Sequence, residues 1–249
     1  MKKILMALLV IMAVQAKSQS LIGGKNIIKT NLSSDILNNY NLTYERSLNH
    51  FMSVSLSYRM MPKSTLPFKS TIKSYLDSYT NSSDINLDDF QIGNTAMTLE
   101  ARFYLGLQKM SGFYIAPYIR RSNFDLSVPI NYKADPASSN TESVGTFNGN
   151  ISANAVGAYF GVQYQILTKV VLDLWIAGGS YGTSSGVLKF TSTTPLPDLA
   201  QSSLKEGLDQ IKADPFKLKS TVNANGGTAD LSGPWAGFRG LGLTVGIRF

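Results

Sequence analysis

The sequence has 249 residues, of which 43% are hydrophobic and 16% are charged, and its formal net charge is +7. Typical soluble domains carry about 25% charged residues, so this chain is poor in charge for that class. Past the N-terminal region there is no run of ~18 apolar residues, which excludes a membrane-spanning helix, and the absence of cysteine predicts neither disulfides nor a lipid-anchored cysteine.

The first 18 residues have the pattern of a cleavable signal peptide. Lys2 and Lys3 precede an apolar stretch at 4–14, and small residues follow it. We expect cleavage after Ala16 or after Ser18. The signal peptide carries three of the 23 basic residues, so a small positive charge remains against 16 acidic residues. Because no block of five or six basic residues occurs, we expect no nucleic-acid partner.

Alternation of apolar and polar residues with a period of two dominates the rest of the chain. At 241–249, for example, Leu243 and Val245 alternate with Thr244 and Gly246. This period is typical of β-strands, whose side chains point to opposite faces in turn. Eight segments show the pattern, and we predict strands at about 26–36, 40–48, 51–61, 93–106, 112–131, 150–167, 170–190 and 238–249.

The connections between these segments alternate in length. Apart from a short first connection, tight turns alternate with long polar stretches at 62–92, 132–149 and 191–237. Short periplasmic turns and long extracellular loops are typical of outer-membrane barrels, in which the apolar face contacts lipid. We therefore predict that residues 19–249 form an all-β domain, an eight-stranded antiparallel up-and-down transmembrane β-barrel. The alternative is a secreted soluble β-sandwich or lipocalin-like barrel.

Two segments of the predicted extracellular loops carry apolar residues at helical spacing. They lie at 70–78 and 196–213, and Asp198 after Pro197 is a plausible helix start in the second. We expect a short helix in each loop.

Several short sequences resemble a known group of proteins. They lie at 28–32, 41–46, 61–63, 66–68, 102–104, 112–118, 171–175 and 232–237. Together they resemble a family of unknown function among the outer-membrane β-barrels of Bacteroidota, in the class of small OmpA- and OmpX-like barrels. The resemblance implies an outer-membrane location and assigns no catalytic residue.

Charged side chains fall on the polar face of the predicted strands. If the apolar face contacts lipid, these side chains point into the lumen, where an unpaired charge is costly. A barrel of eight strands has an interior just wide enough for side chains to fill. We predict a hydrogen-bonded plug, with a gated pore as the alternative, formed by Glu45, Arg59, Glu100, Arg102, Arg120, Asp173 and Arg248.

The sequence offers little for catalysis or metal binding. Enzymes that modify lipids need an activated nucleophile, usually with a histidine base, and the single histidine, His50, is predicted in a periplasmic turn. Asp84, Asp88 and Asp89 could offer oxygen ligands to Ca²⁺, but the segment lacks the glycine and distal glutamate of an EF-hand loop. We interpret it as a solvated acidic loop and expect no catalytic residue, metal or cofactor.

The function that this pattern favours is a non-enzymatic outer-membrane protein that serves as a surface anchor or as an interaction or structural protein. The alternative is a small pore or an accessory subunit of an outer-membrane transport assembly. A lipid-active enzyme is disfavoured because the base is missing. Expected partners are outer-membrane lipids and proteins that contact the extracellular loops.

Overall fold

The computed structural model describes residues 24–65, 89–106, 108–133, 142–211 and 215–249. The predicted signal peptide, the predicted helix at 70–78, and both Asp84 and Asp88 lie outside these residues. No helix in the described ranges is long and apolar enough to cross a membrane. The elements are, in chain order, β1 (Asn26–Asn31), α2 (Leu32–Ile36), β2 (Tyr40–Ser47), β3 (Met52–Thr65), β4 (Gln91–Tyr104), β5 (Gly112–Lys133), β6 (Glu142–Gln165), β7 (Val170–Thr191), α4 (Asp198–Gln210), β8 (Lys217–Asn223), β9 (Gly226–Arg239) and β10 (Gly242–Arg248).

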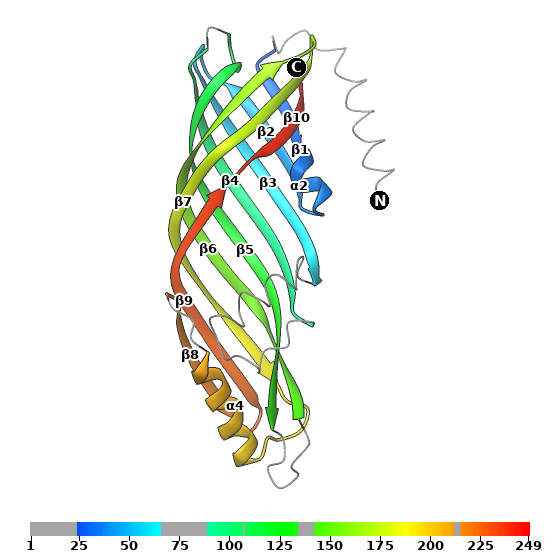
Figure 1. Ribbon diagram of the computed structural model, residues 1–249, viewed down its shortest axis with the longest axis vertical. Coiled ribbons are helices and arrows are strands. Elements are labelled where there is room, and N and C mark those ends of the chain that lie inside the picture. The colour runs from blue at the N-terminus through cyan, green and yellow to red at the C-terminus, as the bar shows by residue number, and fades with distance from the viewer. Residues whose placement is uncertain (1–23, 66–88, 107, 134–141, 212–214) are drawn as a thin grey trace.

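The strands form a closed antiparallel ring (Figure 1). Strands β1 to β7 pair with their neighbours in chain order, and β10 pairs with both β1 and β7. Ring closure therefore involves eight strands, β10 and β1 to β7. This confirms the predicted all-β, eight-stranded up-and-down barrel.

The connections sort to the two ends of the barrel. The turns β2–β3, β4–β5 and β6–β7 are short and lie at one end, which we call the short-turn end. Both ends of the described chain lie there too, because the backbones of Asn26 and Phe249 hydrogen-bond to each other and Arg248 N donates to Lys169 O. Strands β3, β5 and β7 run from the short-turn end toward the opposite end, as the predicted alternation of connections requires.

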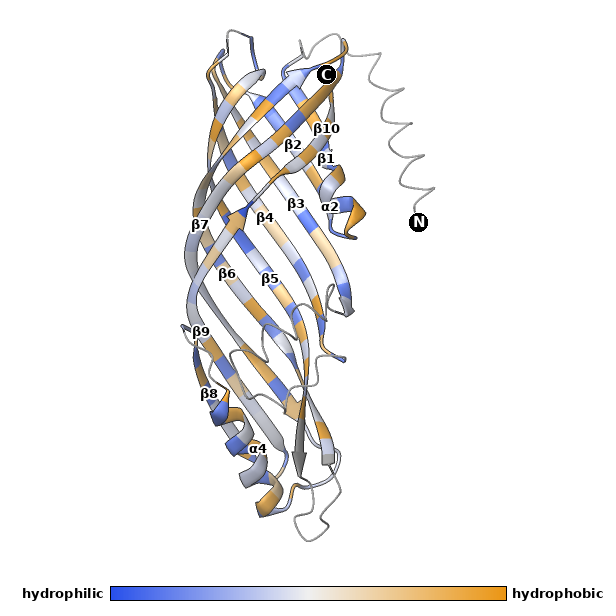
Figure 2. Cartoon of the chain, in the orientation of Figure 1, coloured by the Kyte–Doolittle hydropathy of each residue, from blue (hydrophilic) through white to orange (hydrophobic). Residues whose placement is uncertain are grey.

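Apolar side chains cover the outside of the barrel, and polar side chains point inward. Leu56, Leu99 and Ile119 are 47%, 45% and 56% exposed, whereas their neighbours Ser55 and Thr98 are buried. Figure 2 shows the resulting alternation of hydrophobic and hydrophilic residues along the strands. Apolar outside and polar inside is the reverse of a soluble barrel and is typical of barrels that contact lipid.

The first predicted strand, 26–36, was too long. The strand ends at Asn31 and α2 follows, because the Asn31 side chain accepts a hydrogen bond from Ser34 N at 2.9 Å and so caps the helix. Asp35 holds the same turn from the other side by accepting from Thr30 Oγ1 and Asn41 N.

The predicted loop at 132–149 was largely wrong. Strands β5 and β6 remain paired as far as Lys133 and Glu142. The added length of β6 at 142–149 is mostly polar or glycine, with Glu142 and Asn148 among its residues, so it lacks the apolar alternation on which the prediction relied. Strands of 22 to 24 residues are longer than the ~9–11 residues that a tilted membrane strand needs.

The predicted loop at 191–237 contains the expected helix, α4, but also two strands that the sequence pattern missed. Strand β9 pairs with β7 along the whole of its length, and β8 pairs with β9. Strands β9 and β10 together therefore run along β7, interrupted at Gly240–Leu241. The missed strands are rich in Gly, Ser and Lys, which have low β-propensity.

Helix α4 and the extended strands enclose a second apolar core, far from the short-turn end (Figure 1). Its buried residues come from α4 and the segment before it and from β5, β6, β7 and β9: Ile130, Phe147, Leu188, Leu196, Ala200, Leu204, Leu208 and Ala229. We call α4, β8 and the strand segments around this core the outer module. Asp209 ties the helix to β8 by accepting from Lys205 and Ser220, and these hydrogen bonds lower the pKa of the Asp209 carboxyl.

Candidate functional site in the barrel lumen

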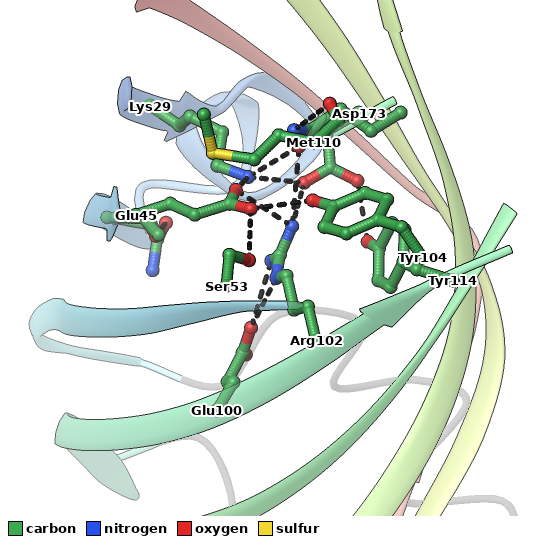
Figure 3. A network of polar contacts seen from close by, with 12 residues as sticks. Lys29, Glu45, Ser53, Glu100, Arg102, Tyr104, Met110, Tyr114 and Asp173 are labelled. Atoms are coloured by element: carbon green, nitrogen blue, oxygen red, sulfur yellow. Dashed lines mark hydrogen bonds and ion pairs between the residues drawn. The ribbon is translucent and has the colours of Figure 1, made fainter. Parts of the chain in front are cut away.

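Arg102 lies at the centre of the lumen, on β4, and is fully buried (Figure 3). Its guanidinium donates to Asp173 at 2.6 Å and to Glu100 at 2.9 and 3.1 Å, and it lies 3.4 Å from a Glu45 oxygen. The planar fork of arginine suits several carboxylates at once, which lysine cannot match. One cation thus joins carboxylates from three strands, β2, β4 and β7.

Lys29 supplies a second buried cation from β1. Its ammonium donates to Glu45 at 2.5 Å, to Asp173 at 2.8 Å and to the Gln163 side-chain oxygen at 2.7 Å. These three acceptors match the three donors of an ammonium group. Lys29 is therefore fully hydrogen-bonded without water.

Tyrosine and serine hydroxyls satisfy the remaining carboxylate oxygens. Glu45 accepts from Tyr104 and Ser53, both at 2.6 Å. Asp173 accepts from Tyr114 at 2.6 Å, and Tyr159 donates to Glu100 at 2.7 Å. Buried charges are tolerated when they are paired and their other lone pairs are hydrogen-bonded, and this cluster meets both conditions.

Arg239 completes the charge balance. It donates from β9 to the second Glu100 oxygen at 3.1 Å, and its guanidinium lies 4.5 to 4.7 Å from the ring centres of Tyr118, Tyr159 and Trp175. Three cations thus face three carboxylates. We call this neutral cluster, with its tyrosines, the lumen plug: Lys29, Glu45, Glu100, Arg102, Tyr104, Tyr114, Tyr159, Asp173 and Arg239.

The lumen plug closes the barrel toward the short-turn end. Every strand of the ring borders it: β1, β2, β4, β5, β6 and β7 contribute its polar side chains, β3 adds Ser53, and Gly246 of β10 lies against Lys29. Apolar residues of the same region, among them Ile27, Met110 and Val171, are buried beside it. Side chains thus fill this cross-section of the described barrel, as the narrow interior of eight strands permits.

The seven charged residues predicted for the lumen fall into three groups. Glu45, Glu100, Arg102 and Asp173 meet in the lumen plug. Arg59 and Arg120 face the lumen farther from the short-turn end and line a cavity instead. Arg248 lies at the short-turn end, bonded to Gly24 O and Gln165, and does not join the others.

Sequence reasoning missed Lys29 and Arg239 as members of the lumen plug. Lys29 is two residues from Asn31 on β1, so both side chains point to the same, inward face. This alternation could have identified Lys29 from the sequence. Arg239 could not be placed by alternation, because the interruption at Gly240–Leu241 changes the phase: Arg239 and Thr244 both face inward. The register of β7 against β6 also shifts, between Phe160 and Gly161, and such a bulge turns later side chains to the other face.

A cavity of about 490 Å³ lies on the other side of the lumen plug. Its walls combine arginines with aromatic and apolar residues: Arg59, Arg120 and Arg239 with Tyr118, Phe124, Trp175, Trp235, Phe238 and Leu241. Ligand sites typically have volumes of roughly 300–1,000 Å³ and a few polar groups in an apolar lining. We call it the lumen cavity.

The structure places His50, the other candidate named from the sequence, away from the lumen plug and the lumen cavity. His50 is exposed in the β2–β3 turn, where the Asn49 side chain accepts from Phe51 N and Met52 N. Within the described ranges no three or more His, Cys, Asp or Glu side chains are grouped as metal ligands would be. Asp84 and Asp88 of the predicted acidic loop are outside these ranges.

The sequence matches one family model over residues 4–185, which is most of the chain. The chain belongs to the DUF3575 family. Its members are described as proteins of unknown function, so membership agrees with the predicted resemblance to a family without assigned function and adds no activity.

Two further comparisons add little. A search of curated proteins found no match. Among solved structures, CarO of Acinetobacter baumannii is similar at 14% identity with a TM-score of 0.38, over 93% of this chain and 100% of that one.

Proposed function

We propose that the protein is a non-enzymatic, non-conducting anchor in the outer membrane that displays the outer module at the cell surface. The observation that carries the proposal is the division of the barrel into two parts with separate interiors. The lumen plug closes the short-turn end, and the outer module has its own apolar core at the opposite end.

The exposed apolar belt supports the membrane location. Large apolar side chains that lie opposite one another on consecutive strands are exposed and form a continuous row on the outside of the barrel: Leu56, Leu99, Ile119, Val156 and Tyr181. Water would make such a continuous band costly, whereas lipid tails solvate it. Outer-membrane lipids are accordingly the first partners that we propose.

The outer module supports a role in display or interaction. Its helix α4 buries Ala200, Leu204 and Leu208 while Leu199 is 61% exposed. A folded surface that is fixed on strands loses less conformational entropy when it binds a partner than flexible loops do. The inferred partners are proteins outside the cell or other surface proteins. The observations that favour a pore are weaker, because the lumen plug crosses the route that ions would take.

Accessibility of single cysteines on intact cells tests this proposal, since the chain has no cysteine of its own. Ser202 is exposed on α4, and Thr168 is exposed in the β6–β7 turn at the short-turn end. We expect a membrane-impermeant maleimide to label Ser202→Cys on intact cells and Thr168→Cys only after the outer membrane is permeabilised. The reverse order of labelling would contradict the proposed orientation, and labelling of both would contradict the membrane location.

A further inference from the structure

The lumen cavity carries positive charge that the barrel does not balance. The charged groups that interact with Arg59 are Arg120, Arg239 and Glu100, and Glu100 already accepts from Arg102 and Arg239. In the described part of the chain no carboxylate forms an ion pair with Arg59 or Arg120. The cavity therefore holds two arginines in excess over its carboxylates.

The two arginines converge on one wall. Arg59 of β3 pairs with Ala96 and Arg120 of β5 pairs with Thr98, two residues apart on the intervening strand β4. Both face the lumen, and Arg120 Nε donates to Ser122 at 3.2 Å, leaving its other N–H groups free of protein partners in the described chain. Guanidinium groups in this arrangement suit a carboxylate or phosphate group, which they bind with paired charge-assisted hydrogen bonds.

An unpaired donor marks the same cavity independently of these charges. Trp175 lines the cavity, is only 6% exposed, and its indole N–H has no hydrogen-bond partner in the described structure. Tryptophan N–H groups usually find a partner when they are buried. A ligand acceptor in the cavity would supply one.

In the described residues, the barrel wall beside the cavity lacks a strand over part of its height. Strand β1 ends at Asn31, and on the other side β9 between Gly233 and Arg239 pairs with β7 only. On the side of this gap nearer the short-turn end, α2 lies against β10, where Ser33 Oγ accepts a hydrogen bond from Leu243 N at 2.7 Å. The described chain thus leaves one edge of β9 without a strand neighbour at the level of the cavity.

Apolar side chains flank this gap. Leu37 from one edge and Phe238 and Leu241 from the other line the cavity, and they are 64%, 83% and 77% exposed. The gap adjoins the apolar belt, because Ala236 of β9 pairs with Tyr181 in the belt row. Lipid tails around the belt would therefore reach the side of the cavity.

We propose that the lumen cavity binds an amphiphile with an acidic head group, taken from the membrane through the gap beside β9. The carboxylate or phosphate contacts Arg59 and Arg120, and the acyl chain leaves between Leu37 and Phe238. The site binds without covalent chemistry and is independent of what the outer module contacts.

The two tryptophans of the chain, Trp175 and Trp235, both line the cavity and report binding directly. The full chain in vesicles of neutral phosphatidylcholine would be titrated with 9,10-dibromostearate, whose bromines quench tryptophan on contact. We expect saturable quenching. The methyl ester of the same acid, which lacks the negative charge, should need at least tenfold higher concentration for the same quenching.

The matched variants are the double change Arg59→Gln with Arg120→Gln and, as a control, Arg121→Gln, which alters the neighbouring exposed arginine on β5. We expect the double variant to weaken dibromostearate binding at least tenfold and the control to leave it unchanged. Equal quenching by acid and ester in the wild type would overturn the proposal without any variant. Displacement of the acid by millimolar inorganic phosphate would overturn it as well, because the site would then be one for soluble anions.

Discussion

Gly161 of β6 lies directly opposite Tyr114 of β5, and the missing side chain makes room for the Tyr114 ring. A Cβ atom at Gly161 would overlap the end of that ring. The ring crosses this space so that its hydroxyl donates to Asp173 at 2.6 Å. The glycine therefore determines whether one carboxylate of the lumen plug keeps its partner.

Replacement of Gly161 by alanine should destabilise the barrel by about 1–3 kcal/mol, as overpacking in filled interiors does. The matched control is Gly179→Ala on β7, where an added Cβ has only Gly237 O near it, at 3.8 Å. Denaturant unfolding in lipid vesicles measures both. Equal free energies of unfolding for the two variants would mean that the Tyr114 ring has room to move.

Removal of the Glu100 carboxylate should leave Arg102 and Arg239 without a shared acceptor. We expect Glu100→Ala to lower the free energy of unfolding by about 3–5 kcal/mol, because a broken buried pair leaves uncompensated charge. Asp125→Ala is the control, since the Lys63–Asp125 pair is exposed and such pairs contribute about 0–1 kcal/mol. A small loss for Glu100→Ala would indicate that water reaches the guanidinium groups.

Neighbouring residues on β4 test which face contacts lipid. Leu99→Arg should cost roughly 2–4 kcal/mol, the value for a cation near the bilayer midplane, whereas Thr98→Asn should be tolerated far better because Thr98 is buried on the polar lumen face. The measurement is again unfolding in vesicles. Similar costs at Leu99 and Thr98 would contradict the proposed membrane-facing surface.

The outer module should unfold without the barrel. Leu204 on α4 is fully buried, so Leu204→Ala should destabilise the module by about 2–5 kcal/mol, whereas Leu199→Ala on the exposed side should change little. Limited proteolysis of the folded proteins would show whether the outer module unfolds alone or together with the barrel. We expect faster cleavage near α4 in the first variant, with a barrel that is still resistant; loss of the barrel as well would show one common core.

The ring of eight strands was predictable because its outer and inner faces carry different side chains, and so its strands alternate strictly between apolar and polar residues. On β4, for example, the exposed Leu99 is apolar, whereas its buried neighbour Thr98 is polar. Far from the short-turn end this alternation is lost: β8 and the added part of β6 are mostly polar, and only a few side chains, such as Phe147 and Val222, pack in the core of the outer module. Their polar sequences read as loop, so the sequence pattern predicted α4 but not the sheet on which it packs.

The lumen charges were predictable only in part. Glu45, Arg102 and Asp173 follow the uninterrupted phase of their strands, and the structure brings them together. Arg239 follows a phase that the break at Gly240–Leu241 changes, so counting back from the last strand places it on the wrong face. The separation of Arg59 and Arg120 from the lumen plug depends on depth along the barrel, which alternation does not encode.

Conductance of the purified full chain in planar lipid bilayers tests most directly the central claim, that the lumen plug closes the barrel. Insertion would be verified by protease protection in the same lipid. The account predicts no steady single-channel current from the wild type, because Arg102, Lys29 and their carboxylates fill the cross-section. A steady open current from correctly inserted wild-type protein would contradict it.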